Sequence, residues 1–203
     1  MSKSGLEHWQ ERYATPDYLF GTAPNAFLKS QAHLFPKRGT ALAIADGEGR
    51  NGVFLAEQGL DVLSLDFSPL AQAKARQLAA ARGVDMRIEQ ADITAWRWPE
   101  AAFDLVAAIF FQFSAPPERD AIFAGIRKTL KPGGLLLLEG YRPKQLEYNT
   151  GGPSQVENLY TRELLEQAFA GFSTLDIREH DSEIAEGVRH VGMSALIDLV
   201  GRK

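Results

Sequence analysis

The sequence contains no cysteine, which excludes a disulfide framework, a thiolate nucleophile and a cysteine-ligated metal site. Long apolar stretches are also absent, because the longest run, Leu105 to Phe111, is far too short to cross a bilayer. The first ten residues lack the apolar core of a secretory signal peptide. We therefore expect a protein without a membrane segment, located in the cytoplasm.

Positive charge and histidine are scarce as well. The 22 lysines and arginines are scattered and are outnumbered by 26 acidic residues, so the net charge is −4 and no nucleic-acid surface is expected. The four histidines (His8, His33, His180 and His190) are dispersed without metal-ligand spacing, and no metal site is expected. We expect His190, at the start of a strand, to be structural.

What the sequence does contain is an alternation of strand and helix signals. The 203 residues, 45% of them hydrophobic, suffice for one sizeable α/β domain. Between about residues 40 and 140 apolar runs alternate with helical segments, which predicts a parallel sheet with helices on both faces. The predicted strands are 41–45, 61–65, 85–89, 103–110 and 134–139, followed by a hairpin of 172–179 and 190–200 joined through Glu186-Gly187.

Two helices carry clear terminal signals. A Ser-Pro pair at 68–69 supplies an N-cap and a proline at the first helical position, so a helix is predicted over 69–82, with Gly83 ending it. A second helix is predicted from Pro116 to about Leu130, after which a Lys-Pro-Gly-Gly turn leads into the next strand.

The most informative segment is the glycine-rich stretch 41–52, which follows an apolar strand and precedes a helix. It satisfies the pattern Gly-x-Gly-x-x-Gly, and Asp66 ends the next strand 19 residues after Gly47. Glycines let the backbone approach a ligand closely, and a carboxylate at roughly 20 residues' distance accepts hydrogen bonds from a ribose diol. The sequence therefore predicts an adenosine-containing cofactor, although a tight turn without a ligand would show the same glycines.

Several residues near this loop have two interpretations. Asp66 could cap the following helix, but Ser68 is better placed for that, so ribose binding is favoured. Phe67 is interpreted as packing on the adenine edge, on the core, or on both. Asp92 is favoured as an acceptor for the adenine amino group, with Ile93 against the ring face, over a solvated turn residue.

At this point the chain resembles the class I S-adenosylmethionine-dependent methyltransferases over essentially its whole length. The motifs that carry the resemblance are the Gly47–Asn51 loop, Asp66, Ala91-Asp92-Ile93, Phe103-Asp-Leu-Val106, Leu130-Lys-Pro-Gly-Gly134 and the closing strand pair. The front end, from Trp9 to Leu28, is similar more specifically to the small tellurite-resistance and thiopurine methyltransferase group, whose N-terminal segment covers the cofactor.

The resemblance implies a fold and a division of the chain. The implied fold is α/β, a Rossmann-like doubly wound seven-stranded sheet, mostly parallel, with an antiparallel C-terminal strand and helices on both faces. One domain, 1–203, would comprise a cofactor-covering segment (1–30), a cofactor-binding core (40–140), a substrate lid (140–160) and a C-terminal helix with a strand pair (161–203).

The implied cofactor is S-adenosyl-L-methionine. The residues expected to bind it are Phe20, Asp46, Gly47, Glu48, Gly49, Asn51, Asp66, Phe67, Ser68, Ala91, Asp92, Ile93 and Phe110. The family's usual acidic residue in the first strand falls at Ala43 and its first loop glycine at Ala45, so Asp46 and Glu48 are interpreted as supplying the acidity a few residues later.

The chemistry is expected where the fourth and fifth strands end. One or two rings of the run Phe110–Phe113 are expected to line the methyl-transfer channel, because aromatic faces stabilise the sulfonium cation. Gln112, within that run, would orient a substrate or bond the cofactor backbone. Glu139 and Tyr141 are the catalytic candidates, and the segment 148–153 is interpreted either as a substrate lid or as a tight loop.

Three functions remain open on the sequence. The favoured one is in-line transfer of a methyl group to a small-molecule acceptor; a soft sulfur, selenium or tellurium acceptor would need no general base. The alternatives are a protein that binds S-adenosylmethionine without catalysis, motivated by Ala43 and Ala45, and an NAD-dependent oxidoreductase, against which no Tyr-x-x-x-Lys pair occurs. We expect a monomer or homodimer.

Overall fold

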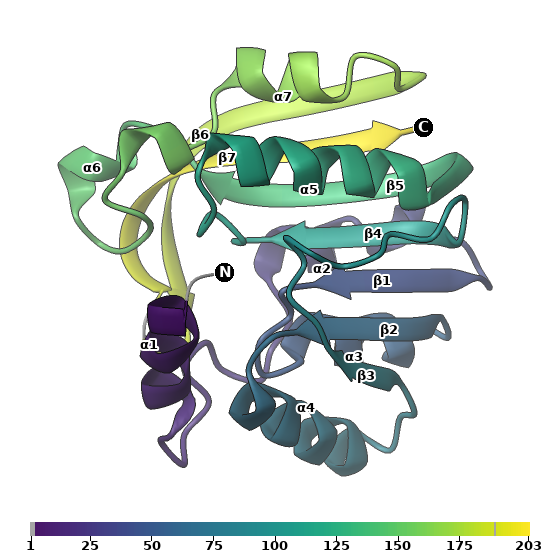
Figure 1. Ribbon diagram of the computed structural model, residues 1–203, viewed down its shortest axis with the longest axis vertical. Coiled ribbons are helices and arrows are strands. Elements are labelled where there is room, and N and C mark those ends of the chain that lie inside the picture. Colours follow the sequence, from purple (N-terminus) through teal and green to yellow (C-terminus); the bar gives the residue numbers. More distant parts are fainter. Residues whose placement is uncertain (1–2, 189) are drawn as a thin grey trace.

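The fold is a single seven-stranded sheet with the strand order β3-β2-β1-β4-β5-β7-β6, seen in a computed structural model that describes residues 3–188 and 190–203 (Figure 1). The strands are β1 (Thr40–Ile44), β2 (Asp61–Asp66), β3 (Arg87–Gln90), β4 (Phe103–Ile109), β5 (Leu130–Tyr141), β6 (Thr174–Glu186) and β7 (His190–Arg202). β1 to β5 pair in parallel, and β7 runs antiparallel to both β5 and β6. The predicted fold is confirmed.

Helices cover both faces of the sheet because the buried strands are apolar at successive positions. Leu42 and Ile44 of β1 pack on the face covered by α5 and α7, whereas Ala41 and Ala43 face α2 and α3. The helices are α1 (Lys3–Tyr13), α2 (Ala26–Ser30), α3 (Arg50–Glu57), α4 (Pro69–Arg82), α5 (Pro116–Thr129), α6 (Gln145–Tyr148) and α7 (Arg162–Ala168), with short 3₁₀ turns at Ala32–Leu34 and Val156–Asn158. In the described part of the chain, none of these helices has the length and apolar character needed to span a membrane.

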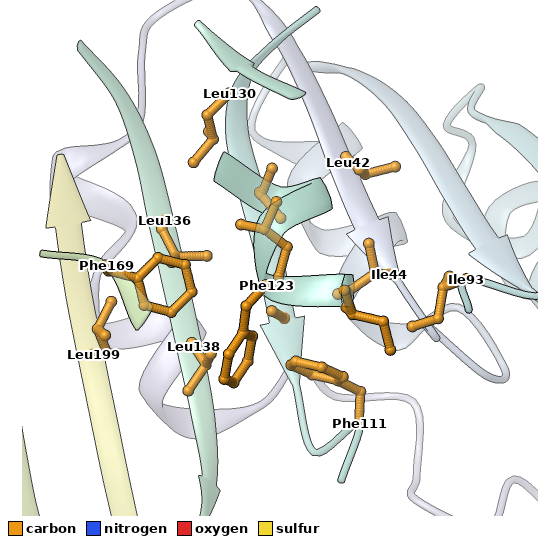
Figure 2. Close-up of a cluster of buried hydrophobic side chains, with 14 of the residues drawn as sticks. Leu42, Ile44, Ile93, Phe111, Phe123, Leu130, Leu136, Leu138, Phe169 and Leu199 are labelled. Atoms are coloured by element: carbon orange, nitrogen blue, oxygen red, sulfur yellow. The ribbon is translucent and has the colours of Figure 1, made fainter. Parts of the chain in front are cut away.

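The larger core cluster lies between the sheet and α5 (Figure 2). Phe123 of α5 is at its centre, with ring centroids 5.7 Å from Tyr160 and 5.2 Å from Phe169. Leu136 and Leu138 of β5 present their side chains to the same cluster. Burial of these large side chains stabilises each by about 1.5–3 kcal/mol relative to exposure, so the cluster fixes the strand ends that carry the site.

The helix ends follow the sequence signals closely. Ser68 caps α4 by accepting a hydrogen bond from the amide of Ala71, and Gly83 ends that helix in the left-handed conformation (φ 66°). Both assignments were predicted from the Ser-Pro pair and the glycine.

Two predicted strands differ from the structure. β3 is a short edge strand that is mostly exposed, rather than a buried apolar run over 85–89, because it has a neighbour on one side only. The expected turn at 131–134 lies inside β5 as a bulge: Phe103 pairs with Leu130, whereas Leu105 pairs with Leu135.

The β6–β7 hairpin is longer than predicted and leaves the plane of the sheet. Its tip bends toward α1 at the edge of the molecule (Figure 1), where the amide of Val188 donates to the carbonyl of Leu19 at 2.9 Å. This bend brings the C-terminal hairpin beside the N-terminal segment and the loop that follows β1.

Candidate functional site

The turn after β1 holds the chain in conformations that favour glycine. Gly47 has φ 58° and Gly49 has φ 87°. A Cβ on Gly47 would approach the Tyr13 hydroxyl to 2.9 Å, and one on Gly49 would approach the Cβ of Ala75 to 2.6 Å. Ala45, where the family has a glycine, adopts φ 47° despite its Cβ, a strained conformation that costs about 1–2 kcal/mol.

Two buried aspartates organise this turn. Asp66 accepts hydrogen bonds from the amides of Gly47 (2.9 Å) and Ser68 (2.8 Å). Asp46 accepts from the Ser64 hydroxyl at 2.7 Å and from the amide of Gly52. Burial raises the pKa of Asp46 to about 7 and that of Asp66 to about 6, although these hydrogen bonds act in the opposite direction.

A cavity opens above this turn, which we call the loop cavity. It is lined by Trp9, Tyr13, Phe20, Ala45, Asp46, Gly47, Arg50, Asn51, Asp66, Phe67, Ile109, Phe110, Phe113 and His190. Seven of the expected cofactor residues are in this lining. Ala91, Asp92 and Ile93 line a small recess that shares Ala45, Asp66, Phe67 and Phe113 with the loop cavity. The cavity therefore brings ten of the thirteen expected residues into one region.

The other three expected residues lie behind the cavity wall and support it. The Glu48 carboxylate pairs with the Lys74 ammonium at 2.7 Å and accepts from the amide of Leu19 at 2.7 Å. Ser68 is occupied by its capping bond to α4, and Gly49 packs against Ala75. Glu48 thus holds the N-terminal segment to α4 instead of facing the cavity.

The N-terminal segment contributes aromatic side chains to the cavity. Trp9 and Tyr13 of α1 stack with ring centroids 5.6 Å apart, and both line the loop cavity together with Phe20. The Tyr18 hydroxyl donates to the carbonyl of Lys74 at 3.0 Å, which fastens the segment to α4. This placement supports the prediction that residues 1–30 cover the cofactor.

A second cavity, the adjoining cavity, lies beside the loop cavity and measures about 850 Å³ including the part open to solvent. The side chains common to both cavities are Trp9, Phe20, Phe110, Phe113 and His190. Gly151, Gly152 and Pro153, from the segment 148–153 predicted as a lid or tight loop, contribute to the adjoining cavity, as do Gln155 and Asn158 from the rest of the predicted lid 140–160. Tyr148 does not line the adjoining cavity. Its hydroxyl instead donates a hydrogen bond to the Asp181 carboxylate at 2.9 Å.

Gln112 lines the adjoining cavity, but its amide is engaged with the protein backbone. Its Nε2 donates to the carbonyls of Tyr141 (2.9 Å) and Asn158 (3.1 Å), and its Oε1 accepts from the amide of Tyr141. The side chain thus joins the ends of β4 and β5, which is a third role beside the two that the sequence left open.

The two catalytic candidates lie in different places. Tyr141 lines the adjoining cavity, its ring centroid is 4.8 Å from that of Phe110, and its buried hydroxyl has no hydrogen-bond partner among the described residues. Glu139, two residues earlier in β5, accepts from the side-chain amide of Asn25 and lines a third cavity at the base of the hairpin. The structure therefore places Tyr141, but not Glu139, beside the shared aromatic wall.

His190 lies in the site although its position at a strand start suggested a structural residue. Its ring lies 4.5 Å from Phe20 and 4.7 Å from Phe110, between centroids, and it lines both cavities. Burial lowers its pKa, so the imidazole is neutral near pH 7. The sequence did not predict Arg50 as a site residue either. The positions of Arg50 and His190 both depend on the hairpin tip, because Arg50 pairs with Glu186 at 2.6 Å. No local sequence pattern predicts a contact between residues so far apart in the chain.

Comparison with known proteins places this site in a family. A sequence family described as "Methyltransferase domain" matches residues 41–134, which contain the glycine loop and Asp66. The demethylmenaquinone methyltransferase of Thermus thermophilus is 36% identical over 110 residues, covering 53% of this chain and 49% of the relative. These similarities support a class I S-adenosylmethionine-dependent methyltransferase. The chain spans about half the length of the curated relatives it matches.

Solved structures share the fold over nearly the whole length of this chain. A structure described as "Conversion of a Disulfide Bond into a Thioacetal Group during Echinomycin Biosynthesis" has a TM-score of 0.75 at 19% identity and covers 98% of this chain and 91% of its own. TehB from Haemophilus influenzae has a TM-score of 0.72 at 16% identity, covering 98% of this chain and 66% of its own. The cofactor of the family is S-adenosylmethionine, which decides against NAD.

Proposed function

We propose that this methyltransferase transfers the methyl group of S-adenosylmethionine to a small-molecule acceptor, with the cofactor in the loop cavity and the acceptor in the adjoining cavity. The aromatic wall that the two cavities share carries this proposal, because Phe110, Phe113 and His190 line both. An in-line displacement needs the acceptor atom next to the methyl carbon. Two cavities that share lining residues lie side by side, so molecules bound in them can approach each other closely enough.

The residues of the loop cavity fit the cofactor. Asp66 is a buried residue in the lining of both the loop cavity and the recess, and it offers carboxylate oxygens to a ribose diol. The recess between Phe67 and Ile93 is narrow and largely apolar, as a flat adenine requires. Asp46 is the acidic residue available to the methionine ammonium, the position left open by Ala43. When bound, the cofactor supplies a methyl group on a cationic sulfur, which aromatic faces stabilise.

The lining of the adjoining cavity favours a soft or anionic acceptor. Among the described residues it includes no carboxylate, and its titratable side chains are Arg12, Tyr141 and His190. Arg12 adds a positive charge that favours an anion, and burial raises the pKa of Tyr141, so its hydroxyl stays neutral and can donate a hydrogen bond. A thiolate, or a selenium or tellurium oxyanion, needs no base; an acceptor that must lose a proton would give it to the neutral imidazole of His190.

The test is the formation of S-adenosylhomocysteine with a panel of acceptors: thiols, selenite and tellurite against phenols and amines. We expect turnover with members of the first group. Turnover confined to amines would contradict the proposed acceptor class. Tight S-adenosylhomocysteine binding with no turnover on the whole panel would favour the alternative of a protein that binds the cofactor without catalysis.

A substitution in the adjoining cavity separates the two sites. Gln155 is an exposed residue of its lining, so Gln155→Trp should obstruct acceptor entry and raise the acceptor KM several-fold. The dissociation constant of S-adenosylhomocysteine should stay unchanged, because Gln155 does not line the loop cavity. The matched control is Gln167→Trp on the exposed side of α7. An unchanged KM in Gln155→Trp would show that the acceptor enters elsewhere.

A further inference from the structure

Three strands bring three metal-ligating side chains together at the base of the hairpin, outside the cofactor and acceptor cavities. Glu139 comes from β5, His180 from β6 and Asp198 from β7, and their ligand atoms all lie within 4.8 Å of one another. Nε2 of His180 is 3.0 Å from Oδ2 of Asp198. All three side chains line a third cavity of about 990 Å³ including the part open to solvent, which we call the hairpin cavity.

One atom of this cluster lacks a partner. Oδ1 of Asp198 is buried and has no hydrogen-bond partner among the described residues, and the whole residue is only 8% exposed. Glu139, directly beside it in the β5–β7 pairing, is 4% exposed and accepts one hydrogen bond from Asn25. Two carboxylates buried so close together repel each other unless a proton or a cation lies between them.

The charges around the hairpin cavity favour a cation. Besides Glu139 and Asp198 its acidic lining consists of Asp176, Glu183 and Glu186, and its basic lining of Arg178 and His180. Glu186 is neutralised by Arg50. The remaining four carboxylates face a single permanent positive charge, so the cavity is negative when they are ionised.

We propose that Glu139, His180 and Asp198 bind one divalent transition-metal ion of the zinc or manganese class. One imidazole nitrogen and two carboxylate oxygens form a ligand set that both ions accept. In a tetrahedral site with ligands at about 2.1 Å, neighbouring ligand atoms are about 3.4 Å apart, so the cluster, whose ligand atoms lie within 4.8 Å of one another, would contract by about 1.4 Å at most to close the site.

The surroundings of His180 agree with a ligand role. Its other ring nitrogen, Nδ1, lies 2.7 Å from the hydroxyl of Ser182, and such a second contact fixes the tautomer and orientation of a metal-ligating histidine. The ion would join β5, β6 and β7 where the hairpin leaves the sheet. It would thereby stabilise the strand pair that carries His190 into the active site. Phe110 lines this cavity as well as the other two, so the proposed ion site adjoins the active site.

The first experiment measures retained metal in the full chain with any affinity tag removed. Protein stripped with a chelator is equilibrated with Zn²⁺ or Mn²⁺, desalted and analysed by mass spectrometry of the metal. We expect one equivalent for the wild type, and at least tenfold weaker binding for Asp198→Asn and His180→Asn. The matched controls are Asp176→Asn, in the same cavity, and His33→Asn, an exposed histidine; both should retain the ion.

The second measurement is the melting temperature with and without added ion. Zn²⁺ should raise it for the wild type and for Asp176→Asn, but not for Asp198→Asn, whose fold is checked by circular dichroism. If Asp198→Asn does not fold, Glu139→Gln takes its place. The proposal is wrong if the stripped wild type retains no ion, or if the ligand variants retain it as the controls do. Neither result depends on whether the chain transfers methyl groups.

Discussion

At the residue scale, the site is built from side chains held in costly states. Asp46 and Asp66 are both buried at the turn after β1, and burial raises their pKa values to about 7 and about 6. Phe110 adopts φ 52°, a conformation that a bulky residue rarely tolerates, and lines all three cavities. Strain and buried charge of this kind gather where a ligand is bound.

The replacement of Asp66 by alanine tests the cofactor site. We expect Asp66→Ala to weaken S-adenosylhomocysteine binding at least about 100-fold, because two charge-assisted hydrogen bonds are each worth about 1.5–3 kcal/mol. Isothermal titration measures the loss. Asp66→Asn keeps the shape of the turn, and Asp61→Ala, at the exposed start of the same strand, serves as control. Unchanged affinity in both Asp66 variants would remove Asp66 from the site.

Cofactor affinity should depend on pH through the same carboxylates. Because Asp46 and Asp66 must be ionised to bind the ammonium and the ribose diol, the affinity for S-adenosylhomocysteine should rise from pH 5.5 to 7.5 and then level off. With pKa values of about 7 for Asp46 and about 6 for Asp66, the affinity at pH 6 should be about twentyfold below its plateau. Titrations at successive pH values test this, and Asp46→Asn should flatten the profile; a wild-type affinity that falls with pH would refute it.

The stability of the ligand-free protein should change in the opposite sense. A carboxyl group whose pKa is higher in the folded than in the unfolded chain binds protons more tightly when folded. Its contribution to the free energy of unfolding is therefore complete below pH about 4, the unfolded pKa. It is lost as the pH rises through 6 to 7, the folded values for Asp66 and Asp46.

At the scale of the elements, the β6–β7 hairpin is what assembles the site from distant segments. Its Glu186 carboxylate accepts hydrogen bonds from Arg50 of α3 at 2.6 Å and from the amide of Ala26 at 3.0 Å. Burial alone would raise the pKa of Glu186, but the imidazole of His190, whose Nδ1 lies 3.8 Å away, and the bond from Arg50 lower it to about 2. The hairpin, the N-terminal segment and the glycine loop therefore meet at one buried ion pair.

Neutralising this carboxylate should loosen the hairpin tip. We expect Glu186→Gln to lower the free energy of unfolding by about 2–4 kcal/mol, because it leaves Arg50 buried without its counter-ion. Urea unfolding measures the loss, and hydrogen exchange should show faster exchange at the tip and at residues 19–26. Glu183→Gln, on an exposed position of the same strand, should change neither; an equal effect of both substitutions would argue against the ion pair.

At the scale of the whole molecule, the ends of the strands of one sheet gather the site, and the N-terminal segment completes it. β1, β2, β4 and β5 run parallel, so the turns after them gather at one edge, and the antiparallel β7 returns from the hairpin tip into that same edge. The cluster around Phe123 fixes α5 and α7 against the strand ends from one side. Site geometry and global stability therefore depend on the same packing.

Removal of the Phe123 ring tests this dependence. Phe123 is 1% exposed, so Phe123→Ala should lower the free energy of unfolding by about 3–5 kcal/mol through lost burial and a residual cavity. Urea unfolding gives the value, and Leu146→Ala, at a side chain that is 44% exposed, should cost little. A loss below 1 kcal/mol for Phe123→Ala would mean that the cluster repacks freely.

The sequence by itself determined whatever rests on local spacing. The glycine turn, Asp66, the cap at Ser68 and the end at Gly83 follow from backbone geometry and from near-neighbour hydrogen bonds, which residues a few positions apart specify. The alternation of apolar runs with helices determined the sheet and its layers. Local spacing also assigned a cofactor role to Glu48, whose side chain in the structure pairs with Lys74.

Only the tertiary structure decided which distant side chains share a cavity. His190 enters the aromatic wall and Arg50 pairs with Glu186, because the hairpin bends over the sheet edge. Glu139 lies beside Asp198, because the two are partners in the pairing of β5 with β7. That bend depends on packing between segments more than 130 residues apart, such as Arg50 and Glu186. Periodicity and propensity describe neighbours in the chain, so contacts of this range become visible only when the chain has folded.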